Sequence, residues 1–98
     1  MKMYILKDRV PVQVRDTIEW AKWFEKADRI VKQDDAAKDV RVSTVFLGID
    51  HNFYGGTPLV FETMIFGGPH DQYQRRCSTW NQAEEMHAEA LKLAKEGT

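Results

Sequence analysis

Glu62 and His87 are the two side chains whose chemistry and expected positions together suggest a reactive site. Glu62 interrupts an apolar run, and the two-residue period of a strand places it on the same face as Met64. His87 lies on the apolar stripe of a C-terminal helical pattern, together with Ala83 and Leu91. A carboxylate and an imidazole that meet inside a domain can act as general acid and base, or can ligate a metal ion.

The same two residues also fit a purely structural role. A buried carboxylate needs a partner, so Glu62 and His87 can form a hydrogen-bonded pair, or they can lie apart and never meet. Structural pairs perturb pKa values as catalytic pairs do, so residue type alone does not separate the two cases. We favour the structural role and expect no metal site, no cofactor and no enzymatic turnover that depends on Glu62 and His87. The alternative is a small hydrolase or transferase that uses Glu62 and His87 with Asp50.

A polar segment followed by two aromatic residues forms a second candidate site. Asp50, His51 and Asn52 end an apolar run and lead into a loop that carries Phe53 and Tyr54. Binding residues gather on loops held by a rigid scaffold, and aromatic side chains there can insert into a partner. Asp and Asn also favour turns, because their side chains hydrogen-bond the local backbone. Binding and turn formation both remain open for this segment.

Arg75 and Arg76 form a third candidate site next to Tyr73. Guanidinium groups make bidentate contacts to phosphate, so the pair can clamp a phosphate or a nucleotide. The commoner arrangement is a solvated, charged strand edge that discourages the addition of another strand.

Composition excludes several classes of protein. The chain has 98 residues, of which 43% are hydrophobic and 30% charged, which is typical of one folded domain. Fourteen Lys and Arg against fifteen Asp and Glu leave a formal net charge of −1, which disfavours nucleic acid and anionic membranes as partners. No run approaches the roughly 18 apolar residues of a membrane span, and Cys77 is the only cysteine, so we expect a cytoplasmic protein.

The clearest secondary-structure signal is a central hairpin. Residues 42–46 and 60–65 are rich in β-branched and aromatic residues and flank a Gly-Gly-Thr-Pro loop. This pattern predicts two adjacent antiparallel strands with a long connection. Weaker patterns predict three further strands and a polar turn: strands at residues 3–7, 29–33 and 73–77, and the turn at residues 34–39.

Two helices complete the prediction. Asp16 and Glu19 have the spacing of a helix N-cap with its reciprocal carboxylate. An apolar stripe follows, which we expect to be largely buried although it could instead be an exposed binding face: Trp20, Trp23, Phe24 and Ala27. The second helix is capped by Ser78 or Thr79, covers residues 80–96 with Leu91 buried, and ends at Gly97.

The order of these elements predicts a single α+β domain over residues 1–98. A mostly antiparallel sheet is built on the central hairpin, and two helices pack on one face of it. A domain this small gains stability by pairing, so we also expect a homodimer or a larger homo-oligomer.

Three segments resemble small uncharacterised proteins encoded by tailed phages and prophages: VSTVFLGIDH at residues 42–51, LVFETMIFGG at 59–68, and STWNQAE at 78–84 followed by His87. The resemblance covers roughly the C-terminal two thirds of the chain. It carries no activity, so it implies only a context, that of a phage accessory protein acting on host machinery or host defence. Combined with the absence of a catalytic motif, it favours a protein that binds a host protein or a small signalling ligand.

Overall fold

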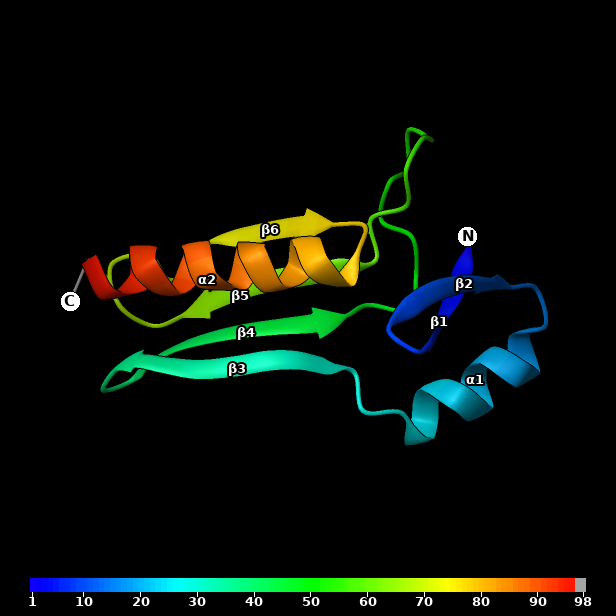
Figure 1. The fold of residues 1–98 in the computed structure, drawn as a ribbon, viewed down its shortest axis with the longest axis horizontal. Coiled ribbons are helices and arrows are strands. Elements are labelled where there is room, and N and C mark those ends of the chain that lie inside the picture. Colours follow the sequence, from blue (N-terminus) through cyan, green and yellow to red (C-terminus); the bar gives the residue numbers. More distant parts are fainter. Residues whose placement is uncertain (97–98) are drawn as a thin grey trace.

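The computed structural model describes residues 1–96 and has eight elements (Figure 1). They are β1 (Met3–Lys7), β2 (Val10–Val14), α1 (Thr17–Lys26), β3 (Ile30–Ala37), β4 (Val40–Phe46), β5 (Phe61–Phe66), β6 (Gln74–Cys77) and α2 (Trp80–Glu96). None of the helices in this range is long and apolar enough to cross a membrane.

The central sheet confirms the predicted hairpin and the α+β class. Its four strands are antiparallel in the order β3-β4-β5-β6, and β4 pairs with β5 from Val42 opposite Ile65 to Phe46 opposite Phe61. The predicted strand near residues 73–77 is β6, which pairs with β5. Helix α2 lies across one face of this sheet and contacts all four strands (Figure 1).

The N-terminal elements form a separate layer at one end of the sheet (Figure 1). Strands β1 and β2 make a two-stranded hairpin, and helix α1 packs against this hairpin. Two backbone hydrogen bonds join β1 and the residue before it to the segment after β4, from Tyr4 N to Gly48 O at 2.8 Å and from Asp50 N to Lys2 O at 3.0 Å. The expectation that both helices cover one face of the central sheet therefore holds for α2 and is wrong for α1.

Helix α1 begins as predicted but is less buried than predicted. The Asp16 carboxylate accepts hydrogen bonds from the backbone of Ile18 and Glu19. No residue of α1 is fully buried, and the side chains of the apolar stripe are half-buried because the helix covers only a two-stranded hairpin: Trp20, Trp23, Phe24 and Ala27. Leu91 of α2, also expected to be buried, is likewise half-buried.

Trp20 and Phe24 hold α1 in place around Gly48. The Trp20 indole N–H donates to Tyr4 O at 3.1 Å and to Gly48 O at 3.0 Å, so one side chain joins the helix to both backbone segments. The Phe24 ring stacks on Trp20 at 4.6 Å. Gly48 has φ +78°, and a Cβ there would lie 3.0 Å from the Phe24 ring. Both the left-handed backbone and the ring contact therefore favour glycine.

The predicted polar turn at residues 34–39 is wrong for most of its length. Strand β3 continues to Ala37, and the turn consists of Lys38 and Asp39, which has φ +60°. The reason is a tertiary contact: Asp34 directs its carboxylate to His87 on α2.

Helix α2 begins as predicted, because Thr79 caps it by accepting from Gln82 N at 3.1 Å. The predicted terminator Gly97 lies outside the described residues.

The core under α2 consists of two apolar clusters with a polar layer between them. Phe46, Phe61 and Ala83 belong to one cluster. Val42, Ile65 and Ala90 belong to the other cluster. The alternation of β4 and β5 places Thr44 and Thr63 between the clusters, opposite His87 of α2.

Candidate functional site

His87 is the centre of a buried chain of hydrogen bonds. Its Nδ1 lies 2.7 Å from Thr44 Oγ1, and its Nε2 lies 2.8 Å from Asp34 Oδ2. Thr44 Oγ1 also forms a short hydrogen bond with Thr63 Oγ1. A neutral imidazole that is protonated on Nε2 satisfies both of its contacts, donating to the carboxylate and accepting from the Thr44 hydroxyl.

The order of carboxylate, imidazole and hydroxyl is that of a nucleophilic triad, but its setting is structural. The Thr44 and Thr63 side chains are fully buried, and His87 is 1% exposed, so no substrate can reach the hydroxyl. Within residues 1–96, every buried polar side-chain atom has a hydrogen-bond partner. This arrangement holds α2 to three strands and keeps the imidazole and both hydroxyl groups from solvent.

Glu62 belongs to a different network on the opposite face of the sheet. The next residue, Thr63, faces α2, so the alternation of β5 turns Glu62 away from it. The Glu62 carboxylate accepts from Arg76 Nε at 2.9 Å and from Gln74 Nε2 at 2.8 Å. The structure therefore does not bring Glu62 and His87 together.

Asp34, Thr44 and Thr63 were missed by sequence reasoning. The Asp34-Asp35 pair is typical of a turn, and a threonine inside a β-branched run is typical of any strand. One signal was available, because Thr44 and Thr63 fall on the same faces as the most apolar residues of the hairpin. Such positions are buried, and a buried hydroxyl needs a polar partner.

The loop between β4 and β5 projects from the body of the molecule and is called the finger, residues 50–58 (Figure 1). Its base is closed by Asp50, whose Oδ1 accepts from Asn52 N at 2.8 Å and from Leu59 N at 2.9 Å. Asn52 spans the loop, donating from Nδ2 to Thr57 O at 2.9 Å and accepting from Tyr54 N at 3.3 Å. The predicted turn chemistry of Asp50 and Asn52 is therefore present.

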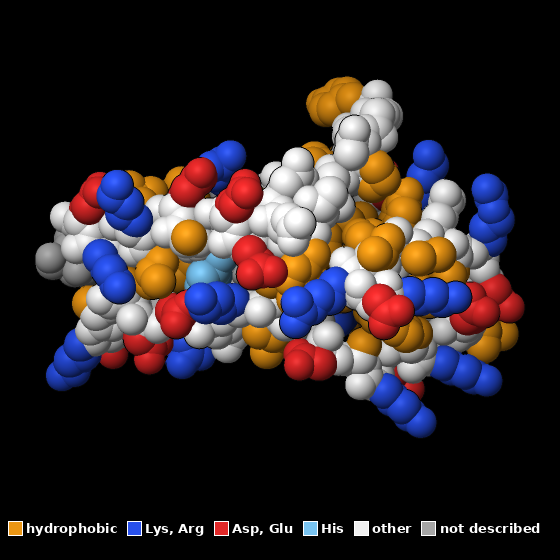
Figure 2. Space-filling view, viewed as in Figure 1, with side chains coloured by type: hydrophobic (Ala, Val, Ile, Leu, Met, Phe, Trp, Pro, Cys, Tyr) orange, Lys and Arg blue, Asp and Glu red, His pale blue; other side chains and the backbone are white. Residues whose placement is uncertain are grey.

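The end of the finger is aromatic and exposed. Phe53 is 71% exposed and Tyr54 is 100% exposed. Figure 2 shows hydrophobic side chains at the end of the projection, separated from the other hydrophobic surface. His51 lies lower, with Nδ1 3.0 Å from Ile49 O and its ring 6.0 Å from that of Phe53. Asp50 and Asn52 thus shape the loop, and Phe53 and Tyr54 point into solvent.

The electrostatics at the base of the finger involve Tyr4. Burial raises the pKa of the Tyr4 phenol, and the negative charge of Asp50 raises it further. Tyr4 is 8% exposed and belongs to the core cluster with Phe46. The base of the finger is therefore anchored to the packed interior, while its end is not.

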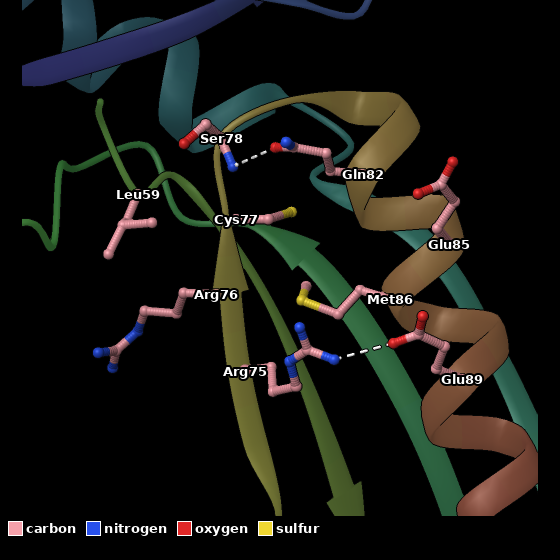
Figure 3. A pocket seen from close by; sticks show the side chains of 9 residues that line it. All are labelled: Leu59, Arg75, Arg76, Cys77, Ser78, Gln82, Glu85, Met86 and Glu89. Carbon is pink, nitrogen blue, oxygen red and sulfur yellow. Dashed lines mark hydrogen bonds and ion pairs between the residues drawn. The ribbon is translucent and has the colours of Figure 1, made fainter. Parts of the chain in front are cut away.

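Arg75 and Arg76 point to opposite sides of β6 (Figure 3). Arg75 donates to Glu89 of α2 at 2.8 Å, while Arg76 pairs with Glu62 on the open face of the sheet at 2.9 Å. Two guanidinium groups on opposite faces cannot clamp one phosphate together. The structure therefore does not support a phosphate clamp built from both residues.

A hollow of about 350 Å³ lies between β6 and α2 and is called the β6 groove (Figure 3). Its lining residues are Leu59, Arg75, Arg76, Cys77, Ser78, Gln82, Glu85, Met86 and Glu89. Cys77 is half-buried there, and burial raises the pKa of its thiol. Nothing in the lining resembles a metal centre, and residues 1–96 hold no group of three or more His, Cys, Asp or Glu side chains that could ligate an ion.

Comparisons of the chain with protein-family models, with curated proteins and with solved structures find no match.

Proposed function

We propose that this chain is a binding protein that inserts the end of the finger into a pocket of a partner protein. The observation that carries the proposal is the exposure of Phe53 and Tyr54 at the end of a loop that is closed by its own hydrogen bonds. Large aromatic side chains dominate the energetics of many protein interfaces when a partner buries them. A loop that is already ordered loses less conformational entropy on binding.

The resemblance to phage accessory proteins suggests that the partner belongs to the host cell, in the host cytoplasm, with a role in host takeover or anti-defence. The small size of the chain and the burial of Thr44, Thr63 and His87 favour a binding role over turnover. Nothing observed assembles Glu62, His87 and Asp50 into one site, so the hydrolase or transferase alternative gains no support.

A small signalling ligand is the second candidate partner, and one observation favours it. A hollow of about 440 Å³ lies between the finger and the N-terminus, lined by Met1, Lys2, Asp50, Asn52, Phe53, Gly55 and Gly56. This volume is within the range of small-molecule sites. Mass spectrometry of the native protein separates the two candidates, because a small ligand would add a discrete mass to the purified chain.

We also propose that the protein is a homo-oligomer that pairs through the open face of the central sheet. Within residues 1–96 no helix covers this face. Val45, Met64 and Phe66 lie on it, and Ile30 pairs with Val45 at its edge. Ile30 is 48% exposed and Phe66 43% exposed, and apolar side chains of this size are commonly covered in oligomers.

The finger is tested with the double variant F53A/Y54A and a matched control. Ile18 on α1 is 66% exposed and lies outside the finger, so Ile18→Ala removes a comparable exposed side chain. Each protein is expressed in host bacteria, partners are quantified after affinity purification, and the strongest candidate is purified and titrated by calorimetry. We expect the double variant to bind at least about 30-fold more weakly, because truncating one hot-spot residue costs about 2 kcal/mol or more. Equal affinity of F53A/Y54A and the wild type would refute the proposal.

A further inference from the structure

Strand β6 has one paired edge and one open edge. Cys77 O accepts from Val60 N at 3.0 Å and Tyr73 O from Ile65 N at 3.1 Å, so the odd-numbered residues face the neighbouring strand. In an antiparallel ladder the residues between them point their N–H and C=O groups the other way. Gln74 and Arg76 therefore present backbone donors and acceptors outward. Among residues 1–96, no strand pairs with that edge.

The β6 groove lies between α2 and β6, the strand with the open edge (Figure 3). The apolar part of its lining consists of Leu59, Cys77 and Met86. The lining is charged where Arg75 reaches Glu89. A strand added to β6 would point alternate side chains into this groove, so the groove can select side chains while the backbone supplies hydrogen bonds.

The charges of Arg75 and Arg76 determine which kind of segment can pair with the open edge of β6. If a second copy of β6 paired in antiparallel register with full overlap, Arg75 would lie opposite Arg76 of that copy and Arg76 opposite its Arg75, which is unfavourable. An acidic side chain at either position is favourable instead. The Arg75–Glu89 pair does not prevent this, because both side chains are more than half exposed, at 53% and 65%, and such pairs contribute little to stability.

We propose that the open edge of β6 binds an extended acidic segment of a partner protein as a fifth strand of the central sheet. In antiparallel register, an apolar residue of that segment lies opposite Cys77 and enters the apolar part of the groove. The next two residues are acidic, one opposite Arg76 on the open face and one opposite Arg75 on the α2 side. The fourth residue lies opposite Gln74. This site does not involve the finger, so this proposal can be tested independently of the proposed function.

The opposite edge of the sheet is less suited to the same role. Strand β3 has register irregularities at two places along its pairing with β4, between Ile30 and Lys32 and between Asp35 and Ala37. Bulges disturb the regular spacing of outward backbone groups, which is a common way of blocking strand addition. No register shift interrupts the pairing of β6 with β5.

The test compares Arg76→Pro with Arg76→Ala, using a fluorescein-labelled octapeptide that has Val-Glu-Glu-Thr at its centre. Both variants lose the ion pair with Glu62, but only proline removes the outward N–H and occupies the edge. Proline is tolerated in edge strands where the N–H faces solvent. We expect saturable binding by fluorescence anisotropy to the wild type and to Arg76→Ala, and binding at least tenfold weaker to Arg76→Pro.

Four further measurements distinguish strand addition at β6 from other modes of peptide binding. A peptide N-methylated at the amides that face β6 should bind the wild type at least tenfold more weakly, which does not depend on the folding of any variant. A peptide with Lys in place of Glu should bind at least tenfold more weakly, and F53A/Y54A should bind the acidic peptide as the wild type does. Amide NMR shifts should centre on Gln74 and Arg76. The proposal is overturned by a lack of saturable binding, by equal binding of the two Arg76 variants, by equal affinity of the lysine peptide, or by self-pairing through β6.

Discussion

The side chains of Asp34 and His87 meet at 2.8 Å between Oδ2 and Nε2, although 53 residues separate them in the sequence. This contact joins β3, an edge strand of the central sheet, to helix α2. The other ring nitrogen of His87 contacts Thr44 on β4, so one side chain relates the helix to two strands at once. A polar contact between two apolar clusters is directional, and it fixes how far α2 can slide along the sheet.

Asp34→Ala should lower the free energy of unfolding by about 1 to 3 kcal/mol, because it leaves a buried imidazole N–H without its acceptor. Asp35→Ala is the matched control. Asp35 pairs with Arg41 in an exposed ion pair, which is worth about 0 to 1 kcal/mol. Urea denaturation of both variants measures the difference. Equal losses would mean that the contact between Asp34 and His87 contributes nothing to stability.

Glu62 and His87 should behave as independent residues. They share no hydrogen-bond partner, so the losses from Glu62→Gln and His87→Asn should add to within about 0.5 kcal/mol in the double variant. Asp34→Asn combined with His87→Asn should instead deviate from additivity, because those side chains are in contact. Any loss of function in the single variants should follow the unfolded fraction. Loss of function with an unchanged thermal midpoint would instead indicate a chemical role.

The sequence predicted the elements whose signals are local and missed the contacts that depend on register. The central hairpin was predictable because its β-branched runs and glycine-containing loop are contiguous. The inward position of His87 followed from its helical stripe. Its partner Asp34 did not, because the pairing depends on how far β3 extends before it turns, and the polar Asp-Asp pair indicated a turn.

Glu62 shows the opposite error. Strand alternation correctly placed it on the same face as Met64, and its apolar neighbours suggested that this face is interior. The face is open because α1 packs on the β1–β2 hairpin and leaves only α2 to cover the central sheet. No local pattern specifies which sheet a helix will cover, so the exposure of Phe66 could not be predicted either.

Gly48→Ala should destabilise the protein more than Gly55→Ala. Both glycines have a left-handed backbone, with φ +78° and +85°, so both variants incur a backbone cost of about 1 to 2 kcal/mol. Only at Gly48 does a neighbouring side chain oppose the substitution. The added Cβ would lie 3.0 Å from the Phe24 ring, whereas a Cβ added at Gly55 would have nothing within 4 Å. Thermal unfolding of the two variants separates the ring contact from the backbone cost. Equal melting temperatures would show that Phe24 moves aside freely.

The open face of the central sheet predicts a homodimer. Sedimentation at micromolar concentration should give a species of at least twice 11.4 kDa. Replacing Ile30 and Phe66 by serine should shift it towards the monomer, since both are exposed apolar residues on that face. Val10→Ser on β2, where the side chain is 57% exposed, should have no effect. A wild-type protein that sediments only as an 11.4 kDa species would refute this prediction.

Cys77 should react slowly with alkylating reagents. The thiolate is the reactive form, and burial raises the pKa of this thiol, so a smaller fraction is ionised at a given pH than in an exposed cysteine. The midpoint of the alkylation rate against pH should therefore lie above that of the urea-unfolded chain, which serves as the control. Arg75 lowers the pKa of Cys77 through its positive charge, so Arg75→Gln should move the midpoint further up. The same midpoint for the folded and unfolded chains would mean that the thiol is open to water and that the β6 groove has no apolar part.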